Sequence, residues 1–370
     1  MSPLRRTGRP PVMPPLLDPI RVLVVEDSPT VRKLLVEMLE SDPELRVVGV
    51  AEDGLSAVRQ AIRLAPDVIT MDVNMPGQDG LAATKQIMSE APTPIIIVSS
   101  TASQRSVALS LDATQAGALM VLPKPEGPLG PHYAEQRDEL IQMTKAMARV
   151  KVVRRWGARP GRPRSMVGGV GAEDFAPGTV RLVAVGCSTG GPAALQRILA
   201  ALPAHFPAPI AVVQHMALGF LGGLASWLGG STALRVTVVR DGELLAPGTV
   251  YLAADDRHLD IVADPGGSGR LRARLVDLPP VAGFRPSASY LYGAAARTVG
   301  PGAVGVVLTG MGNDGVEGLR ELHAARGRVY AQDEASSVVF GMAREAIRGG
   351  VVDEVLSLDE IVARLREVAR

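Results

Sequence analysis

The sequence predicts an α/β protein with two doubly wound domains, each built on a mostly parallel sheet. Short apolar runs alternate with amphipathic segments of helical spacing along most of the chain. A segment rich in Gly, Pro and Arg interrupts this alternation, and 370 residues suffice for two or three hydrophobic cores. We therefore expect a disordered tail at 1–19, a first domain at 20–150, a linker at 151–178 and a second domain at 179–370.

Five apolar runs in the first domain predict its five strands. They are IRVLVV, LRVVGVA, DVITM, PIIIVSS and ALMVL, at 20–25, 45–51, 67–71, 94–100 and 118–122. Amphipathic stretches such as TVRKLLVEMLES and GLSAVRQAIRLA lie between them, which predicts helices on both faces of the sheet. A closing helix is expected near 134–150.

The second domain repeats this alternation on a larger scale. Strands are expected at RLVAVG, PIAVVQ, RVTVV, AVGVVLT and RVYAQD, and a hairpin at TVYLAADDRHLDIV, residues 249–262. Helices are expected at PAALQRILAAL, GFLGGLASWL, VEGLRELHAA and, at the end of the chain, LDEIVARLREVAR.

Composition limits the classes of partner and compartment. The formal net charge is +1 and aromatic residues make up 3% of the chain, so the sequence indicates protein or small-molecule partners and no nucleic acid. The single cysteine, Cys187, excludes an intrachain disulfide framework and suits a reducing cytoplasm. Prolines interrupt the N-terminal segment, and the chain lacks an apolar run of roughly 18 residues. We expect a cytoplasmic protein without direct membrane insertion.

Carboxylates follow two of the first domain's predicted strands. Glu26 and Asp27 follow the first strand and Asp72 follows the third, so all three are expected at one sheet edge. Such a cluster repels itself without a cation, and Mg²⁺ prefers oxygen ligands of this kind. Ser99 ends the fourth strand and Lys124 follows the fifth, and they would help to hold a phosphoryl group transferred to an aspartate. Alternatively, the acids are solvated loop residues or helix caps.

The motifs EDS, MDVNMPGQDG, VSST and PKP, in this order, resemble the receiver domain of two-component response regulators, a flavodoxin-like fold. The resemblance implies that Asp72 accepts a phosphoryl group from a histidine kinase and that Ser99 and Lys124 sense it. It also implies a set of Mg²⁺ ligands: Glu26, Asp27, Asp72 and the backbone carbonyl of Asn74. One departure is Val121, three residues before Lys124, where the family often has an aromatic residue.

In the second domain, GCSTG at 186–190 has the G-x-S-x-G spacing of a nucleophile turn between a strand and a helix. The glycines relieve crowding around Ser188, and the N–H groups at the helix start suit an oxyanion. Two alternatives stay open: a helix cap, or a loop that binds phosphate through its backbone. The Walker lysine is missing, which weakens the nucleotide alternative.

A nucleophilic serine needs a base, and the chain has five histidines. His132 lies beside the linker, His205 in a Pro-rich connection and His323 inside a predicted helix. His215 directly follows the core strand PIAVVQ, at the edge where Ser188 is expected. His258, in the predicted hairpin, is the alternative, although a surface or structural role suits it better.

The stretch GMGNDG at 310–315 fits the dinucleotide fingerprint G-x-G-x-x-G, and Asp333 lies at the required distance. A bound pyrophosphate would lie near Asp314, and like charges about 5 Å apart cost roughly 3 kcal/mol at an effective dielectric of 20. Asp314 instead suits an acid that orients His215, and capping the helix after it is a compatible alternative.

The motifs GCSTGG, QHM, FRPSAS, LTGMGNDG and VVFGMAREAI, behind a receiver domain, are similar to the chemotaxis protein-glutamate methylesterase family, from about residue 20 to the end. The resemblance implies a Rossmann-like esterase domain with a triad of Ser188, His215 and Asp314. It also implies an oxyanion donor at the Met311 amide and support from Thr189.

Members of this family hydrolyse methyl esters on glutamates of methyl-accepting chemoreceptors, and many deamidate receptor glutamines. Their receiver covers the active site until a histidine kinase phosphorylates it, and the esterase chemistry needs no cofactor. Ser289, in FRPSAS, stands where the family often has Asp, and Cys187 is expected to be a small packing residue. Two other classes stay open: a docking module with a vestigial triad, and a nicotinamide dehydrogenase.

Overall fold

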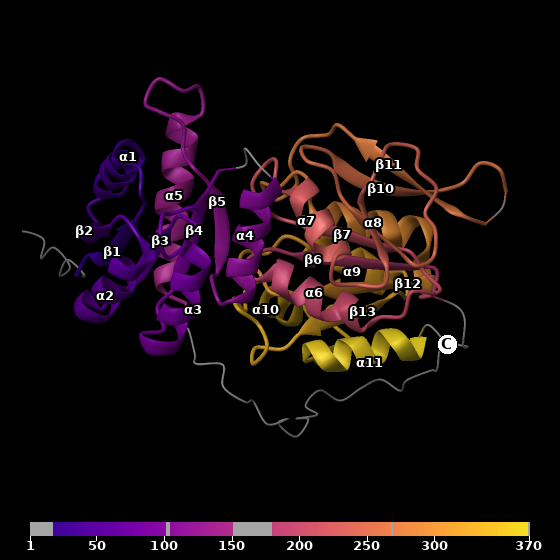
Figure 1. Ribbon diagram of the computed structural model, residues 1–370. Coiled ribbons are helices and arrows are strands. Elements are labelled where there is room, and N and C mark those ends of the chain that lie inside the picture. The colour runs from indigo at the N-terminus through magenta and orange to yellow at the C-terminus, as the bar shows by residue number, and fades with distance from the viewer. Residues whose placement is uncertain (1–17, 101–103, 151–179, 268, 369–370) are drawn as a thin grey trace, which may run out of the picture.

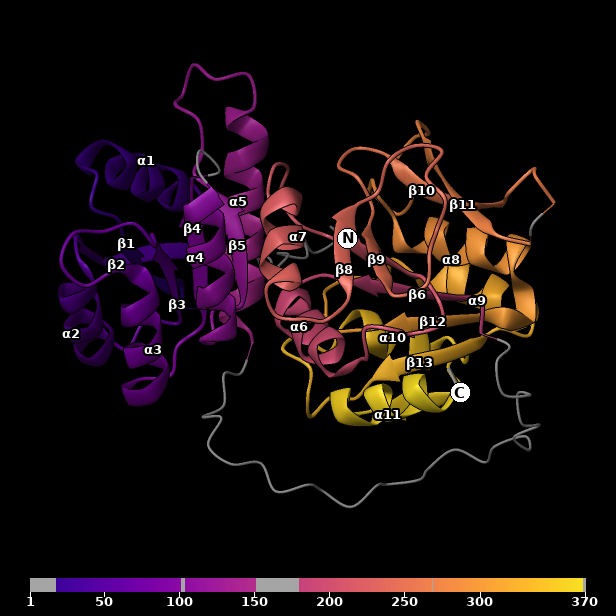
Figure 2. The ribbon, with the colours of Figure 1, turned by 45° about the vertical axis from the view of Figure 1, so that its right-hand side comes forward.

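The computed structural model describes residues 18–100, 104–150, 180–267 and 269–368. Two α/β domains lie side by side in Figures 1 and 2. The expected linker and all of the expected tail except Asp18 and Pro19 lie outside the described residues. Within the described ranges, no helix is both long and apolar enough to cross a membrane.

The first domain has five parallel strands in the order β2-β1-β3-β4-β5. The strands are β1 (Ile20–Val25), β2 (Leu45–Ala51), β3 (Val68–Met71), β4 (Ile95–Ser99) and β5 (Met120–Pro123). The helices are α1 (Pro29–Glu40), α2 (Gly54–Leu64), α3 (Gly80–Glu90), α4 (Gln104–Gln115) and α5 (Tyr133–Ala148). Buried residues of α1 and α5 share one core with the sheet, and those of α2, α3 and α4 share another, so both faces are covered as expected.

The second domain has seven parallel strands in the order β14-β13-β12-β6-β7-β9-β8. The strands are β6 (Leu182–Cys187), β7 (Ile210–Gln214), β8 (Arg235–Val238), β9 (Thr249–Leu252), β12 (Ala303–Val307), β13 (Arg328–Gln332) and β14 (Glu354–Leu356). Helices α6 (Gly191–Ala201), α7 (Leu221–Gly229) and α11 (Leu358–Val368) cover one face. The other face packs on α8 (Ala288–Thr298), α9 (Val316–Ala324), α10 (Met342–Arg348) and the ribbon β10 (His258–Ala263) with β11 (Leu271–Val276).

The strand order of this sheet reverses between β6 and β12. On one side of β6 the sheet continues with β7, β9 and the edge strand β8, whereas β12, β13 and β14 extend it on the other side. A reversal of this kind leaves a crevice beyond the carboxyl ends of the two central strands. Residues that follow β6, β7 and β12 therefore lie at one place.

One expected element is wrong. Residues 249–262 do not form a hairpin: β9 pairs in parallel with β7 and β8, whereas β10 pairs antiparallel with β11 in a separate ribbon. The apolar residues of β9 are all buried in the main sheet, so this strand forms a central ladder instead of a two-stranded turn. The turn signal AADDR thus marks an exit from one sheet into another.

Helix α4 of the first domain packs against the second domain. Its residues Val107 and Leu111 belong to the same buried cluster as residues of α6 and α7, and the figures place α4 beside these two helices in both views. Gly223 of α7 leaves room for Val107, because a Cβ atom at Gly223 would lie 2.2 Å from the Val107 side chain. The indole of Trp227 donates a hydrogen bond to Asp112 at 2.7 Å.

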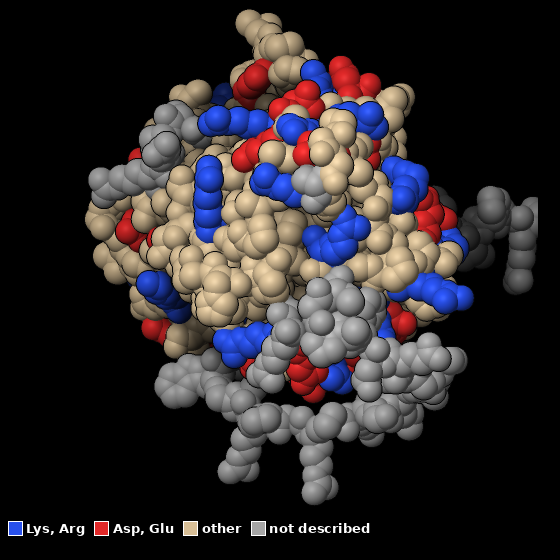
Figure 3. Space-filling view, turned by 90° about the vertical axis from the view of Figure 1, so that its right-hand side faces the viewer, with Lys and Arg blue, Asp and Glu red and all other residues tan. Residues whose placement is uncertain are grey.

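The side of the second domain that faces away from the first domain carries both basic and acidic residues (Figure 3). Figure 3 shows Lys and Arg interspersed with Asp and Glu on the side turned away from the first domain. On the ribbon, Arg274 pairs with Asp260 and Arg272 pairs with Asp264, so positive side chains there have acidic partners. This mixture agrees with the formal net charge of +1.

Candidate functional site

The first domain brings its predicted acids together. One carboxylate oxygen from each of Glu26, Asp27 and Asp72 lies within 4.8 Å of the others, where β1 and β3 end. The Lys124 ammonium contacts Glu26 at 2.9 Å and Asp72 at 2.8 Å, which links β5 to the same pocket. These carboxylates are therefore not separate solvated loop residues.

Glu26 is fully buried in this pocket. Burial raises the pKa of Glu26 to about 7, and repulsion from Asp72 adds to the effect, although Lys124 opposes it. Within the described part of the chain, the Oε2 atom of Glu26 and the Oγ atom of Ser99 are buried without a hydrogen-bond partner. A divalent cation would neutralise the repelling carboxylates, and the Oε2 atom of Glu26 could serve as one of its ligands. The donor set therefore fits Mg²⁺.

Two further predicted residues lie beside this pocket. The backbone N–H of Asn74 donates to Asp72 at 3.2 Å, and its side-chain amide donates to Ser106 at 2.9 Å. Ser99 is fully buried at the end of β4. Asn74 is thus in contact with Asp72, while Ser99 offers an unused hydroxyl at the same sheet edge.

In the second domain, the turn after β6 presents Ser188 next to His215. The strands pair Cys187 with Gln214, so the residues that follow each of them are neighbours across the ladder. The side-chain amide of Gln214 donates to the carbonyls of Ser188 at 2.9 Å and His215 at 2.8 Å. Gln214 is 4% exposed, and its two hydrogen bonds link the turns that follow β6 and β7.

The imidazole of His215 meets the carboxylate of Asp314. Their Nε2 and Oδ2 atoms are 2.9 Å apart, and the side chains are 7% and 0% exposed. The other ring nitrogen, Nδ1, is buried and has no hydrogen-bond partner among the residues that the structure describes. One side of the ring is thus oriented by an acid, and the other nitrogen is available to accept a proton.

Asp314 is held by the start of α8, not by the helix that follows it in sequence. Its carboxylate accepts hydrogen bonds from the Ser287 hydroxyl at 2.7 Å and from the backbone of Ala288 and Ser289 at 2.7 and 3.0 Å. Burial favours the neutral form, but the hydrogen bonds and charge of His215 and the Ser287 bond lower the pKa of Asp314 overall. Gly315 caps α9 without a side-chain bond, so the alternative of a simple Asp314 cap on α9 is wrong.

The GMGNDG loop packs directly on the serine turn. The Ser188 N–H donates to the Thr309 carbonyl at 3.0 Å, and a Cβ atom at Gly310 would lie 2.8 Å from that of Ser188. The Thr189 carbonyl accepts from the Thr309 hydroxyl at 2.9 Å. The contact between Gly310 and Ser188 places Met311, one residue after Gly310, close to the serine turn.

Gly190 allows the serine turn to close. Its φ is +79°, a left-handed conformation that favours glycine, and a Cβ atom there would lie 2.6 Å from that of Val338. Val338, in turn, donates its N–H to the Thr309 hydroxyl at 3.1 Å. Segment 338–341 therefore fastens the serine turn to the GMGNDG loop.

His258, the alternative base, has both ring nitrogens engaged by other groups. His258 is fully buried and stacks on Tyr290, its Nδ1 accepts from Ser287 N–H at 3.3 Å, and its Nε2 contacts the Pro279 carbonyl at 3.0 Å. The expected structural role fits, but a surface position does not. Because both nitrogens of His258 are engaged, it does not compete with His215 for Ser188.

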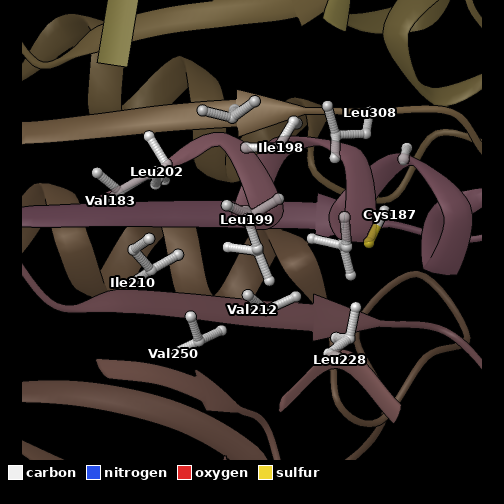
Figure 4. Packing of buried hydrophobic residues seen from close by; sticks show 14 of the residues in the cluster. Val183, Cys187, Ile198, Leu199, Leu202, Ile210, Val212, Leu228, Val250 and Leu308 are labelled. Carbon is white, nitrogen blue, oxygen red and sulfur yellow. The ribbon is translucent and has the colours of Figure 1, made fainter. Parts of the chain in front are cut away.

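Cys187 is a packing residue, as expected. Figure 4 shows it among Leu199, Val212 and Leu308, between α6 and the sheet. Its thiol is buried next to Gln214 Oε1, 3.1 Å away, and this burial raises the pKa of Cys187. The thiolate form is therefore disfavoured.

Sequence reasoning did not assign roles to four residues that support the crevice. Gln214 and Ser289 could have been noticed as polar residues next to the motifs QHM and FRPSAS. The Ser289 hydroxyl accepts from the N–H of Gly315 at 2.7 Å, so serine at this departure from the family pattern still fixes the Asp314 loop. Ser287 had the signal of a helix N-cap, whereas the ring of Phe284 had no local signal.

The first domain touches the crevice. Met311, Val338 and Val339 pack against the buried cluster that α1 and α5 form with the first sheet. Through α4, the first domain also packs on α6 and α7, which follow the strands that carry Ser188 and His215. The class that fold and site define is thus a receiver-type domain fused to a hydrolase domain.

Comparisons with known proteins agree. Residues 22–129 match the response regulator receiver domain, and residues 183–365 match the CheB methylesterase family. The protein-glutamate methylesterase/protein-glutamine glutaminase 4 of Myxococcus xanthus (strain DK1622) is 50% identical over 355 residues, which cover 95% of this chain and 98% of that protein. Enzyme 3 of the same name from Anaeromyxobacter dehalogenans (strain 2CP-C) is 52% identical over 346 residues, 94% of this chain and 98% of the relative.

A crystal structure of the Thermotoga maritima CheB methylesterase catalytic domain is 38% identical and covers 51% of this chain and 98% of that chain, with a TM-score of 0.49. The chain belongs to the protein-glutamate methylesterase/protein-glutamine glutaminase family and is a hydrolase with a receiver domain. The dehydrogenase alternative is therefore wrong.

Proposed function

We propose that this hydrolase removes methyl esters from glutamates of methyl-accepting chemoreceptors, and deamidates receptor glutamines, with Ser188, His215 and Asp314 as a triad. The observation that carries the proposal is the buried His215–Asp314 pair at 2.9 Å, beside the turn that presents Ser188. The names of the relatives supply the two reactions, on protein glutamates and protein glutamines, and the family resemblance supplies the receptors. Receptor cytoplasmic helices as substrate would locate the reaction in the cytoplasm.

The chemistry follows from the orientation of the imidazole. His215 accepts the Ser188 proton at Nδ1, while Asp314 stabilises the imidazolium through Nε2. Ser188 Oγ bonds to the ester carbonyl carbon, the bond to the methoxy oxygen breaks, and methanol leaves with the proton from His215. In the second half His215 takes a proton from water, the hydroxyl oxygen bonds to the acyl carbon, and the bond from that carbon to Ser188 Oγ breaks. His215 then gives this proton to Ser188 Oγ, and the free glutamate side chain leaves. For a glutamine substrate, ammonia leaves in place of methanol.

The developing oxyanion needs hydrogen-bond donors next to Ser188. The backbone amide of Met311 serves in this role, because Gly310 lies against Ser188 and no side chain fits between them. Thr189 supports the turn through its carbonyl, which the Thr309 hydroxyl fixes. Neither step requires a cofactor.

The receiver controls access to this crevice. Asp72 accepts a phosphoryl group from a histidine kinase. Glu26, Asp27, Asp72 and the Asn74 carbonyl would hold Mg²⁺, which would neutralise charge on the transferred group. Ser99 and Lys124 bind the phosphoryl oxygens. Lys124 must then leave its bonds to Glu26 and Asp72, and this rearrangement loosens the contacts of the receiver with the esterase domain.

The test is methanol release from membranes that contain methylated receptors. Wild type, Ser188→Ala and Asp72→Asn are each assayed with and without acetyl phosphate and Mg²⁺. We expect release by wild type that the phosphodonor raises, no release by Ser188→Ala, and unstimulated basal release by Asp72→Asn. Full activity of Ser188→Ala would refute the triad, and intact stimulation of Asp72→Asn would refute the phosphoacceptor.

A further inference from the structure

The ring of Phe284 lies flat against the imidazole of His215. The ring centroids are 4.0 Å apart and the planes differ by 5°. Phe284 is partly exposed, whereas the His215 side chain is 7% exposed, so the phenyl ring stands between the imidazole and solvent on that face. The mechanism above leaves Phe284 without a role.

The imidazole needs a second restraint. Its hydrogen bond to Asp314 fixes the position of Nε2, but no described residue forms a hydrogen bond with Nδ1. Rotation about the ring's χ2 torsion is broad for an imidazole, so one hydrogen bond alone does not fix the ring plane. The plane determines where the Nδ1 lone pair points, and therefore whether it meets the Ser188 hydroxyl. A parallel aromatic ring at van der Waals distance removes this freedom.

Phe284 is itself firmly held. Its backbone exchanges two hydrogen bonds of 3.0 Å with Val281 across a tight turn. The next residue, Arg285, donates to Asp256 at 2.7 Å and to Asp277 at 2.9 Å. The loop therefore has one side fixed by backbone pairing and the other by a guanidinium between two carboxylates.

The same segment also holds Asp314. Three residues after Phe284, the Ser287 hydroxyl and the following N–H groups bind the Asp314 carboxylate. Segment 284–289 thus contacts both members of the His–Asp pair, the imidazole by stacking and the carboxylate by hydrogen bonds. A displacement of this segment would move both together.

We propose that Phe284 is a positioning residue for the esterase reaction: its ring sets the plane of the His215 imidazole so that Nδ1 faces Ser188. This inference rests on the proposed role of His215 as the base. The phenyl ring also shields the pair from water, which strengthens the interaction between His215 and Asp314. Because the ring acts through His215, its loss should lower the rate of the chemical step and leave receptor binding unchanged.

The experiment compares full-length wild type, Phe284→Leu, Phe284→Tyr and Phe206→Leu with acetyl phosphate and Mg²⁺ present. Phe206 is a matched control, because it is buried beside the amino end of β7, at the opposite end of the strand from His215. We expect Phe284→Leu to lower kcat by roughly 10- to 100-fold with KM within about twofold, since small misplacements of a catalytic group cost rates of this order. Phe284→Tyr keeps the flat ring and should retain kcat within about threefold.

A second readout does not depend on activity. In protein with ¹³C-labelled histidine, the chain gives five imidazole ring signals, and His215→Ala identifies one of them. Ring current from a stacked phenyl group shifts that signal. Phe284→Leu should move it strongly, while Phe284→Tyr and Phe206→Leu should leave it near its wild-type position.

The outcomes separate the two proposals. Inactive His215→Ala together with wild-type kcat in Phe284→Leu would overturn the positioning role alone. An unchanged His215 signal in Phe284→Leu would overturn it as well. Active His215→Ala would overturn the proposed base, whatever the Phe284 variants do. A rise in KM with unchanged kcat would make Phe284 a substrate contact and would also overturn the inference.

Discussion

Trp227→Phe should release the esterase domain from its receiver. The indole N–H of Trp227 on α7 donates to Asp112 on α4 at 2.7 Å, a partly buried bond to a carboxylate between the two domains. Phenylalanine keeps an aromatic ring but has no donor. The substitution therefore removes one specific attachment of the receiver and leaves the serine turn and its histidine untouched.

The magnitude follows from the kind of bond. A hydrogen bond to a charged group contributes about 1.5–3 kcal/mol net, and the lower end applies at this partly exposed position. A change of 1.4 kcal/mol is tenfold in an equilibrium constant. If basal activity reflects the small fraction of molecules with separated domains, that activity should rise about tenfold.

The assay is basal and acetyl-phosphate-stimulated methanol release by full-length enzyme. We expect the basal rate to rise and the stimulated rate to stay constant, so that the stimulation ratio falls by the same factor. Gln196→Ala is the matched control: Gln196 accepts an exposed bond from Gln115 at 2.8 Å, and its loss should change the basal rate by less than about twofold. A folded Trp227→Phe enzyme with an unchanged basal rate would refute the reasoning.

Three further predictions concern the supporting residues. Ser287→Ala removes the hydroxyl that donates to Asp314 at 2.7 Å and caps α8. The free energy of unfolding measured in urea should fall by about 2 kcal/mol, and kcat should fall roughly tenfold. Unchanged values would contradict the role of this hydroxyl. Gly190→Ala should lose at least about 2 kcal/mol and activity, because φ is +79° and Val338 blocks the new Cβ, whereas Gly222→Ala, with open space in α7, should not be destabilised in thermal melts. Glu26 has a folded-state pKa of about 7, above the unfolded value of 4.5, so without Mg²⁺ its contribution to stability is present below pH 4.5 and is lost as pH rises towards 7. Relative to Glu26→Gln, wild type should therefore become less stable by roughly 3 kcal/mol over that window, and Mg²⁺ should reverse the loss. Parallel pH curves would disprove the cause given for the pKa.

The sequence predicted those parts of the fold that periodicity controls. The five strands of the receiver and the core strands β6, β7, β12 and β13 were visible as apolar runs, because parallel strands are buried on both faces. The hairpin at 249–262 was wrong because partner choice is a long-range property: β9 is adjacent to β10 in sequence but pairs with β7 and β8. A local turn signal contains no information about which sheet receives the next strand.

The site divided in the same way. Residues at the ends of central strands, such as Ser188 and His215, could be placed from the rule that parallel strands end at one edge. The support from α8 could not, because Ser287 and Asp314 are distant in sequence and meet only after the sheet has formed. The stack of Phe284 on His215 depends on the course of an irregular loop, which has no periodic pattern.

The reversal of strand order between β6 and β12 has a consequence for how the enzyme is made. During synthesis the receiver emerges first, and domains generally fold as units in that order. Ser188 and His215 follow on β6 and β7, but Asp314 arrives only when β12 has been synthesised and has added to the free edge of β6. The growing chain therefore has its receiver domain before it has all three residues of the proposed triad. We expect that a ribosome-bound fragment that ends before β12 does not hydrolyse esters. The receiver domain is therefore present before the esterase domain can become active.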